Sequence, residues 1–452
     1  MVLPPPSPSP ASAGEGEIDP LRMRIPGPAR RTRHMPDRQC FFDPLPPPLL
    51  RLGAIPVAQF LRRTWHRTPL LVRQAIPGFA SPVTRDDLFA LAQDEDVESR
   101  LVEHGADRWR LRRGPFSARA LPGIRRKDWT VLVQGVDLHL PAVAGLAARF
   151  RFLPRARFDD VMISYATDGG GVGPHVDQYD VFLLQAQGRR RWRIAERFDP
   201  RLREGMPLRL LANFRAEQEW VLEPGDLLYL PPGVAHDGVA QGESITISIG
   251  FRVPTRQELA DAWAERQGRT APLPGHLSDT LRRRAASPAR LPEELVRAAR
   301  AALRNTMPTA RQLRQTLLEH GTEPKPQVFF DPPRPPMSPS RFARRIRRDG
   351  IVADLRTRML YSGLDFAING ELQEVSGLPA ADRRRLRTLA EQGRLSPESL
   401  AESGAPPRIV PTLPDPGVRR THSQNHATAV QQQSLETLLY AWYCNGWLHL
   451  FS

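Results

Sequence analysis

Two histidines and one aspartate have the residue types and the spacing that point most directly to chemistry in this chain. His175 and Asp177 stand two positions apart, and His236 follows 59 residues after Asp177. Two imidazoles and one carboxylate form the facial triad that holds non-haem Fe(II) and leaves coordination positions open. In a β-strand, side chains two positions apart project from the same face, so the first two ligands would point into one space.

The sequence around each ligand favours a barrel of the cupin type. The segment 179–185, after the His-x-Asp pair, is rich in apolar, aromatic and β-branched residues, which predicts a strand. His236 closes a Gly-x5-Pro-x-Gly-x2-His stretch over 225–236, the spacing of the second cupin motif. Each signal alone is weak, because a single histidine after a turn is more often structural. Their conjunction predicts a metal site.

An oxygenase with this triad needs a bidentate co-substrate, usually 2-oxoglutarate, and a cation that holds its distal carboxylate. The run Arg-Arg-Arg-Trp-Arg over 189–193 offers candidates. In a strand, Arg190 shares a face with Trp192, which we expect to point inward. Because a buried arginine without an anion is costly, we expect Arg190 either to hold the co-substrate or to pair with an internal carboxylate such as Asp226.

Hydroxyl side chains supply further candidate contacts. The predicted strand 244–252 alternates isoleucines with a face made of Ser244, Thr246 and Ser248. We expect Ser244, and Ser164 in an earlier strand, to contact the co-substrate; hydrogen bonds to neighbouring backbone are the alternative. The glycine-rich run 169–173 lacks the Gly-Lys-Ser/Thr ending of a phosphate loop and leads into a strand, so it predicts a flexible entry beside the metal.

Composition bounds the class and location of the protein. Its 452 residues suggest two to four domains. The two cysteines, Cys40 and Cys444, exclude a disulfide framework and favour a reducing compartment. There is no apolar run of about 18 residues and no apolar signal core at the N-terminus, so we expect a cytoplasmic protein without a membrane span.

The charge balance is strongly positive. The chain has 64 Lys and Arg against 49 Asp and Glu, a net charge of +15, and its only lysines are Lys127 and Lys325. One interpretation is codon bias with a solvated basic surface. The other is attraction to a nucleic-acid-rich partner such as a ribosome. Charge alone does not identify the partner.

The order of expected elements divides the chain into four regions. Residues 1–40 are rich in Pro, Ser, Gly and Arg without periodicity and predict a disordered tail. Residues 41–255 predict an all-β barrel with helical decoration. Its strand candidates are short runs between turn residues, at 129–134, 158–166, 176–185, 190–195, 219–222, 226–230 and 244–252.

The remaining regions are helical and mixed. Residues 256–335 become rich in Ala, Arg, Leu and Glu and predict a helical segment. Its apolar stripe, which includes Leu295 and Ala299, serves either the internal core or a dimer face. In residues 336–452 a predicted hairpin, helices and a final strand follow one another in the order of a winged helix. A polar insertion interrupts this region at about 402–433.

Several blocks of the sequence match a known family. The blocks 159–164, 169–185 and 188–193 resemble the JmjC ribosomal oxygenases, and among them the bacterial ribosomal-protein arginine hydroxylases. The likeness covers roughly residues 45–400 and resumes at 434–452. Shorter matches that extend it lie at 99–102, 114–116, 129–134 and 250–252.

The resemblance implies a double-stranded β-helix, a helical segment that forms a homodimer, and a C-terminal winged helix. It implies Fe(II), with 2-oxoglutarate and O2 as co-substrates, and an arginine of the sixteenth protein of the large ribosomal subunit as substrate. By position, the metal ligands are His175, Asp177 and His236, and the co-substrate residues are Arg190, Ser164 and Ser244.

Other functions stay open at this point. A JmjC-type lysine demethylase shares the iron chemistry and differs only in its pocket. A non-catalytic cupin-like binding protein would show no 2-oxoglutarate turnover. Direct nucleic-acid binding through the winged helix is not expected, and a DNA titration at several salt concentrations would detect it.

Electrostatics constrains the substrate site. A chain of net charge +15 repels an isolated basic peptide at long range, and salt screens this repulsion beyond about 8 Å. Binding of a basic substrate must therefore rest on local acidic groups at the mouth of the pocket. The candidates are Asp159, Asp160, Asp168 and Asp180.

Overall fold

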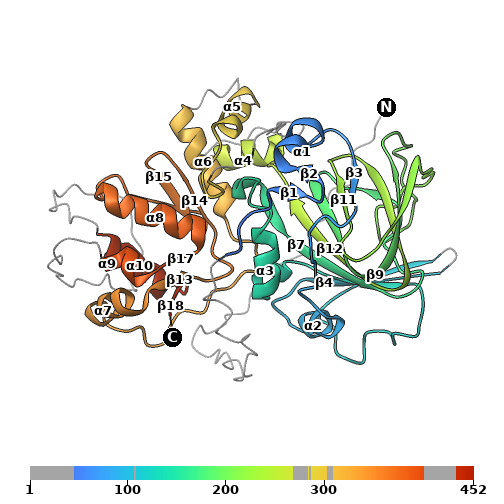
Figure 1. Cartoon of the computed structure of the whole chain (residues 1–452), viewed down its shortest axis with the longest axis horizontal. Helices are drawn as coiled ribbons and strands as arrows, with labels where there is room; N and C mark the ends of the chain where they lie inside the picture. Colours follow the sequence, from blue (N-terminus) through green and yellow to red (C-terminus); the bar gives the residue numbers. More distant parts are fainter. Residues whose placement is uncertain are drawn as a thin grey trace, which may run out of the picture. The chain divides into compact units, whose positions relative to one another are not determined.

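The computed structural model of the chain is drawn in Figure 1. The residues that it describes are 45–105, 108–267, 284, 287–302, 309–401 and 434–451. The tail 1–40 and the polar insertion 402–433 therefore lie outside the described residues, as does part of the helical segment 256–335. None of the described helices is long and apolar enough to cross a membrane.

A ten-stranded antiparallel sheet dominates the N-terminal part of the described chain. Its main path runs β3-β11-β9-β12-β7-β6-β4-β5, with β10 paired to β9 and β8 paired to β12. Figure 1 shows β7, β9 and β12 side by side in this sheet. The strands are β3 Leu70–Val72, β4 Ser99–His104, β5 Trp109–Arg113, β6 Trp129–Val133, β7 Phe158–Ala166, β8 His175–Val176, β9 Asp180–Ala195, β10 Gln218–Leu222, β11 Leu227–Leu230 and β12 Ala235–Phe251.

The two longest strands, β9 and β12, pair with each other along their whole length except at a bulge near the middle of each strand. The register shifts between Gln241 and Ile245 of β12. Opposite this bulge Gly188 has a φ of 65°, and a Cβ there would lie 1.8 Å from the Glu243 carbonyl oxygen, so only glycine fits. The sequence predicted separate strands at 176–185 and 190–195; instead, one bent strand spans Asp180–Ala195.

Aromatic side chains hold a short N-terminal helix, α1 (Val57–Arg63), against the sheet. Phe60 of α1 meets Tyr229 of β11 edge to face with ring centroids 4.9 Å apart, and Trp65 stacks on Phe182 of β9 at 6.1 Å. All four side chains are fully buried. Burial of each such side chain contributes about 1.5–3 kcal/mol, so the cluster fixes β9 and β11 in position. Further short elements around the sheet are β1 Arg51–Leu52, β2 Ile55–Pro56, α2 Arg85–Leu91, η2 Val136–Leu138, α3 Pro141–Ala148 and η3 Arg155–Arg157.

A buried polar network closes one end of β9. Asp180 accepts hydrogen bonds from Arg157 at 2.9 Å and from the Tyr229 hydroxyl at 2.5 Å. His66 Nδ1 lies 3.4 Å from Asp180, and Arg157 lies 3.0 Å from His66 Nε2. A guanidinium only donates, so Nε2 must be unprotonated and the single imidazole proton lies on Nδ1, toward the carboxylate. The network therefore holds a neutral histidine.

This neutral histidine predicts an acid-sensitive fold. Burial, and then Arg157, lowers the pKa of His66 to about 3. The unfolded chain binds this proton near pH 6.5, so the stabilising contribution is complete above that pH and is lost as the pH falls toward 3. Between pH 7.5 and 5.0 the wild type should lose about 2 kcal/mol more unfolding free energy than His66→Asn. Urea unfolding measures it; equal losses in both proteins would contradict the assignment.

The helices after the sheet pack on one another. These are α4 (Arg256–Gln267), α5 (Glu293–Ala302) and α6 (Ala310–Thr322). The predicted apolar stripe of α5 points into this shared core, because Leu295 and Ala299 are buried in one cluster with Trp263 and Leu317. Of the two interpretations of the stripe, internal core is therefore the one that the packing favours.

The last part of the described chain contains two small sheets and further helices. One sheet has the order β14-β15-β16 and the other the order β17-β13-β18. A single apolar cluster packs α7, α8 and α10 on these strands through residues such as Phe342, Leu389 and Trp442. The elements are α7 Pro339–Asp349, β13 Ile351–Ala353, β14 Met359–Ser362, β15 Asp365–Ile368, β16 Glu371–Gln373, α8 Ala380–Gln392, β17 Arg394–Leu395, α9 Pro397–Ala401, α10 Leu435–Cys444 and β18 Leu448–Leu450.

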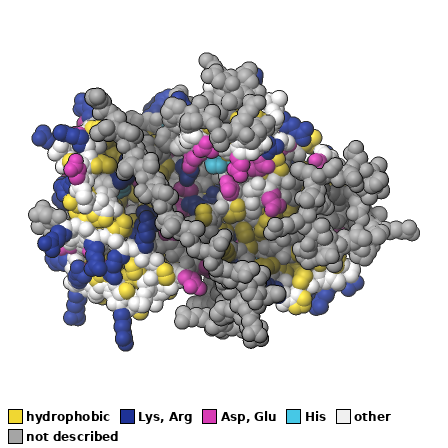
Figure 2. All heavy atoms as spheres, turned by 180° about the vertical axis from the view of Figure 1, so that it is seen from behind, with side chains coloured by type: hydrophobic (Ala, Val, Ile, Leu, Met, Phe, Trp, Pro, Cys, Tyr) yellow, Lys and Arg dark blue, Asp and Glu magenta, His cyan; other side chains and the backbone are white. Residues whose placement is uncertain are grey.

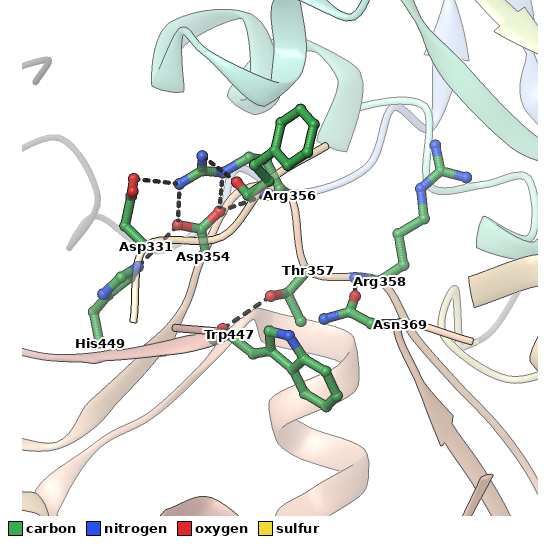
Figure 3. Close-up of polar contacts among 9 residues, drawn as sticks. Asp331, Asp354, Arg356, Thr357, Arg358, Asn369, Trp447 and His449 are labelled. Atoms are coloured by element: carbon green, nitrogen blue, oxygen red, sulfur yellow. Dashed lines mark hydrogen bonds and ion pairs between the residues drawn. The ribbon is translucent and has the colours of Figure 1, made fainter. Parts of the chain in front are cut away.

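The connection between β13 and β14 is held by a cluster of charged residues (Figure 3). Arg356 forks onto both oxygens of Asp354 at 2.7 and 2.8 Å, and His449 Nε2 lies 2.9 Å from the same carboxylate. Arg358 extends away from this cluster in Figure 3, and its guanidinium donates to the backbone carbonyl of Asp159 on β7. The cluster thus shapes a loop that reaches the large sheet.

Candidate active site

Three ligand side chains converge where β8 meets β12. His175 of β8 pairs in register with His236 of β12, and Asp177 follows directly after β8. One ligand atom from each residue lies within 4.8 Å of the others. The Asp177 carboxylate oxygens lie 3.9 Å from His175 Nε2 and 3.6 Å from His236 Nε2. The structure therefore brings together the three residues that the sequence singled out.

Both imidazoles present the same nitrogen to the centre of this group. His175 Nδ1 lies 2.8 Å from the Gly173 carbonyl oxygen, and His236 Nδ1 lies 3.0 Å from the Val234 carbonyl oxygen. A carbonyl only accepts, so each Nδ1 carries the proton and each Nε2 keeps a lone pair for a metal. Burial, and then the neighbouring His175, lowers the pKa of His236 to about 4, which keeps it neutral at neutral pH.

The turn before His236 also positions the aspartate. The Gly233 N–H of the Pro-x-Gly turn donates to the Asp177 carbonyl oxygen at 2.8 Å. The same turn therefore directs His236 inward and holds the backbone of Asp177 beside it. The Tyr179 hydroxyl is hydrogen-bonded to the Asp177 side chain; burial and then this carboxylate raise the pKa of Tyr179, so it stays a donor.

The glycine-rich run before the ligands is packed rather than open, contrary to the expectation of a flexible entry. A Cβ at Gly170 would lie 2.3 Å from the Trp129 carbonyl oxygen, and one at Gly171 would lie 2.6 Å from the Gly238 carbonyl oxygen. These glycines let the chain pass between β6 and β12 at close range. They serve backbone packing beside the ligands.

Arg190 lies on the buried face of the sheet, as strand alternation predicted. It is only 4% exposed, with Trp192 equally buried on the same face. Its Nη1 donates to Ser164 at 2.9 Å and to Thr246 at 3.2 Å, and its Nε has no partner among the described residues. Burial lowers the pKa of Arg190 to about 10, although Asp237 opposes this effect.

The alternative of an internal ion pair between Arg190 and Asp226 is wrong. Asp226 instead pairs with Arg73 at 2.5 Å and accepts backbone hydrogen bonds from Gln74 and Glu223. Within the part of the chain that the structure describes, no carboxylate lies within 4.0 Å of the Arg190 guanidinium. A buried cation without a counter-anion is costly, so Arg190 is the candidate here for binding an anion.

Trp192 connects the arginine to the three ligands. The Arg190 Cζ lies 5.6 Å from the Trp192 ring centroid, and that ring lies 6.0 Å from the His236 ring. The indole is therefore close to both the guanidinium and a ligand imidazole.

The predicted hydroxyl contacts divide into two groups. Ser164 bonds to Arg190 directly, whereas Ser244 accepts a hydrogen bond from Gln185 Nε2 at 3.0 Å. Thr246 was marked by the alternation of hydroxyls and isoleucines, but nothing in the sequence marked Gln185, because its role depends on the register between β9 and β12.

The acidic candidates at the pocket mouth already have internal partners. Lys325 pairs with Asp159 at 3.0 Å and with Asp160 at 2.8 Å, and Lys127 pairs with Asp168 at 2.8 Å. The expectation for Asp180 is wrong, because this residue is fully buried in the His66 network. Only the Asp168 pair is largely exposed, and such surface pairs are weak enough to exchange partners.

Charge is unevenly spread over the surface. Figure 2 shows arginine and lysine side chains gathered at one side of the face in view, and acidic side chains gathered around a histidine near its middle. The net charge of +15 therefore coexists with locally acidic surface. A basic substrate can find complementary surface despite the overall repulsion.

Comparison with known proteins places this site in a family. A model of the JmjC domain matches residues 145–259, which contain the three ligands and Arg190, and a model of the AraC-like ligand binding domain matches 213–320. The chain is 33% identical over 357 residues to the ribosomal protein uL16 3-hydroxylase of Escherichia coli (strain K12), covering 78% of this chain and 94% of that protein. The chain belongs to the JmjC ribosomal oxygenase family.

Other members of the family agree in sequence and in structure. The chain is 38% identical over 207 residues to a probable ribosomal oxygenase of Haemophilus influenzae, covering 45% of this chain and 51% of that protein. The structure of YcfD, a ribosomal oxygenase from Escherichia coli, in complex with cobalt and 2-oxoglutarate, superposes with a TM-score of 0.66. It is 28% identical and covers 89% of this chain and 100% of that chain. The large sheet is thus the cupin-like β domain of a JmjC ribosomal oxygenase.

Proposed function

We propose that this chain is an Fe(II)- and 2-oxoglutarate-dependent protein hydroxylase. The observation that carries the proposal is the pairing of two features. A His-Asp-His group presents two unprotonated Nε2 atoms and a carboxylate to one point. Nearby, the buried guanidinium of Arg190 lacks a carboxylate partner among the described residues. The first suits a divalent metal and the second suits the distal carboxylate of 2-oxoglutarate.

In this proposal the residues have distinct tasks. His175, Asp177 and His236 hold the iron, and Arg190 binds the distal carboxylate with Ser164 beside it. When bound, iron and 2-oxoglutarate supply the oxidising chemistry that consumes O2. Trp192 belongs to a buried apolar cluster and lies close to both Arg190 and His236, so it limits the access of water to both groups. The carbonyls of Gly173 and Val234 keep both ligand imidazoles in the metal-binding tautomer.

The substrate that we propose is an arginine side chain of a large-subunit ribosomal protein. The support is the relation to the uL16 3-hydroxylase, which extends over 78% of this chain and so reaches well beyond the metal site. A ribosomal substrate is strongly basic. Both side chains of the Asp168–Lys127 ion pair are exposed, so the Asp168 carboxylate can exchange Lys127 for a cation of the substrate.

The test is mass spectrometry of purified large-subunit ribosomal proteins after reaction with the chain, Fe(II), 2-oxoglutarate and O2. We expect the gain of one oxygen on one arginine of the uL16 protein, and no gain with Asp177→Ala. Loss of a methyl group from a methylated lysine, with no oxygen retained, would move the chain to the demethylases. Absence of 2-oxoglutarate turnover with every ribosomal protein would favour a non-catalytic binding protein.

We also propose that the helical segment 256–335 forms a homodimer and that residues 336–452 act as a winged-helix-like domain supporting it. Support comes from the family relation, not from the α5 stripe, which is buried within the chain. Light scattering at low micromolar concentration should give twice the chain mass of 50.8 kDa. A mass of one chain under these conditions would refute the dimer.

A further inference from the structure

Gln185 is a fully buried amide that is joined to Arg190 through the Thr246 hydroxyl. It lies on β9, in register with Thr246 of β12, and has no exposed surface. Its backbone is fixed as well, because its N–H donates to the Asp226 carbonyl and its carbonyl accepts from the Gly225 N–H, both at 2.9 Å. A buried amide must satisfy both of its ends, so each partner of this side chain is informative.

The partners of Gln185 fix which way the amide points. Nε2 lies 2.8 Å from the Gln187 carbonyl oxygen and 3.3 Å from the Gly188 carbonyl oxygen. Carbonyl oxygens only accept, so the end of the amide that faces them must be the NH2 group. The other end, Oε1, therefore faces the Thr246 hydroxyl at 2.9 Å and can only accept from it.

This orientation determines the polarity of the next hydrogen bonds. Thr246 has one hydroxyl hydrogen, which it donates to Gln185 Oε1. The lone pairs of Thr246 Oγ1 are then left for Arg190 Nη1, 3.2 Å away, and Ser164 accepts from the same nitrogen at 2.9 Å. Two acceptors thus hold one side of the guanidinium, and its remaining N–H groups stay available for an anion.

The same amide sets the polarity of Ser244. Gln185 Nε2 donates to Ser244 Oγ at 3.0 Å, which leaves the hydroxyl hydrogen of Ser244 available to an acceptor. If Gln185 only joined β9 to β12, the direction of its hydrogen bond with Thr246 would not matter. Here Thr246 donates to Gln185 and accepts from Arg190. The direction deduced from these contacts leaves N–H groups of Arg190 free to donate to a carboxylate.

We propose that Gln185 is a positioning residue for 2-oxoglutarate: it orients the Thr246 hydroxyl and thereby the Arg190 guanidinium that receives the distal carboxylate. This inference rests on the proposed function, because it deepens the assignment of Arg190. It adds a residue that touches neither metal nor co-substrate and acts through Thr246.

The experiment measures binding by titration calorimetry on the full chain loaded with Co(II), without turnover. The two probes are 2-oxoglutarate and 2-oxobutanoate, which keeps the metal-chelating keto acid but lacks the distal carboxylate. Gln185→Leu should weaken 2-oxoglutarate binding about 2- to 12-fold, the range of one neutral hydrogen bond, and leave 2-oxobutanoate binding unchanged. Thr246→Val also removes an acceptor of Arg190 Nη1, so it should weaken 2-oxoglutarate binding at least as much, again without effect on 2-oxobutanoate binding. Thr246→Ser, which keeps the hydroxyl, should bind like the wild type.

Controls separate this role from packing. Gln218→Leu changes an exposed glutamine of the neighbouring strand β10 and should alter neither affinity. In turnover assays Gln185→Leu should raise the KM for 2-oxoglutarate with little change in kcat. If Gln185→Leu does not fold, the isosteric Thr246→Val removes the same hydrogen bond together with the Thr246 acceptor of Arg190.

Two results would overturn the positioning role. One is unchanged 2-oxoglutarate affinity in both variants, and the other is an equal loss for both keto acids. Failure of the proposed function looks different, because the wild type would then bind the two keto acids equally and Arg190→Met would change nothing. A strong effect of Arg190→Met without any effect of Gln185→Leu and Thr246→Val would refute only the role of Gln185.

Discussion

Replacing Asp177 by alanine is expected to abolish 2-oxoglutarate turnover while the fold stays intact. The carboxylate is the only anionic ligand of the three, and its oxygens lie 3.6 and 3.9 Å from the two ligand imidazoles. Loss of an outer partner of a metal ligand alone reduces affinity about 10- to 100-fold, so loss of a ligand should exceed that range. Without bound iron there is no site for the keto acid.

Metal titration and turnover of the purified variant test this expectation together. Asp261→Ala, an exposed aspartate on helix α4, is the matched control and should keep full turnover. Circular dichroism should give the same spectrum for all three proteins, because Asp177 is partly exposed and lies outside the large core clusters. Full turnover by Asp177→Ala would remove this residue from the metal site.

The second large effect is expected for Arg190→Met, which should raise the KM for 2-oxoglutarate about 10- to 150-fold. A hydrogen bond to a charged partner is worth about 1.5–3 kcal/mol, which corresponds to that range. Methionine fills similar volume, so Ser164 and Thr246 lose a donor but the pocket keeps its shape. Steady-state kinetics with varied 2-oxoglutarate measures the change.

Arg191→Met is the control for this prediction. Arg191 neighbours Arg190 on β9 but projects from the opposite face of the strand, and it is more exposed. It should keep the wild-type KM. If Arg190→Met has the same KM for 2-oxoglutarate as the wild type, another cation holds the distal carboxylate.

The parts of the site that could be predicted from sequence are those encoded by local spacing. His175 and Asp177 are close in the chain, and the Pro-x-Gly turn that aims His236 is contiguous with it. Strand alternation beside Trp192 was enough to place Arg190 inside. Each of these inferences needs only the geometry of one strand or one turn.

What escaped prediction depends on pairing between distant segments. Gln185 acquires its role only because β9 and β12 align it with Thr246. Asp180 was expected at the surface, but a fully buried arginine, Arg157, meets it from 23 positions earlier. The two strands expected at 176–185 and 190–195 are one strand that bends at Gly188. The bend depends on a bulge in the partner strand β12, which the sequence of β9 does not contain. No pattern within one segment encodes such register.

The two lysines have a practical consequence for chemical labelling. Lys325 is held between Asp159 and Asp160; burial opposes its charge, but these two carboxylates keep its pKa above the ordinary value. The hydrogen bond to Asp168 also raises the pKa of Lys127, but the side chain of Lys127 is 70% exposed. Within the described residues it is therefore the most accessible side-chain amine for an acylating dye or a cross-linker. A fluorophore attached there would stand beside Asp168, in the segment that leads to His175.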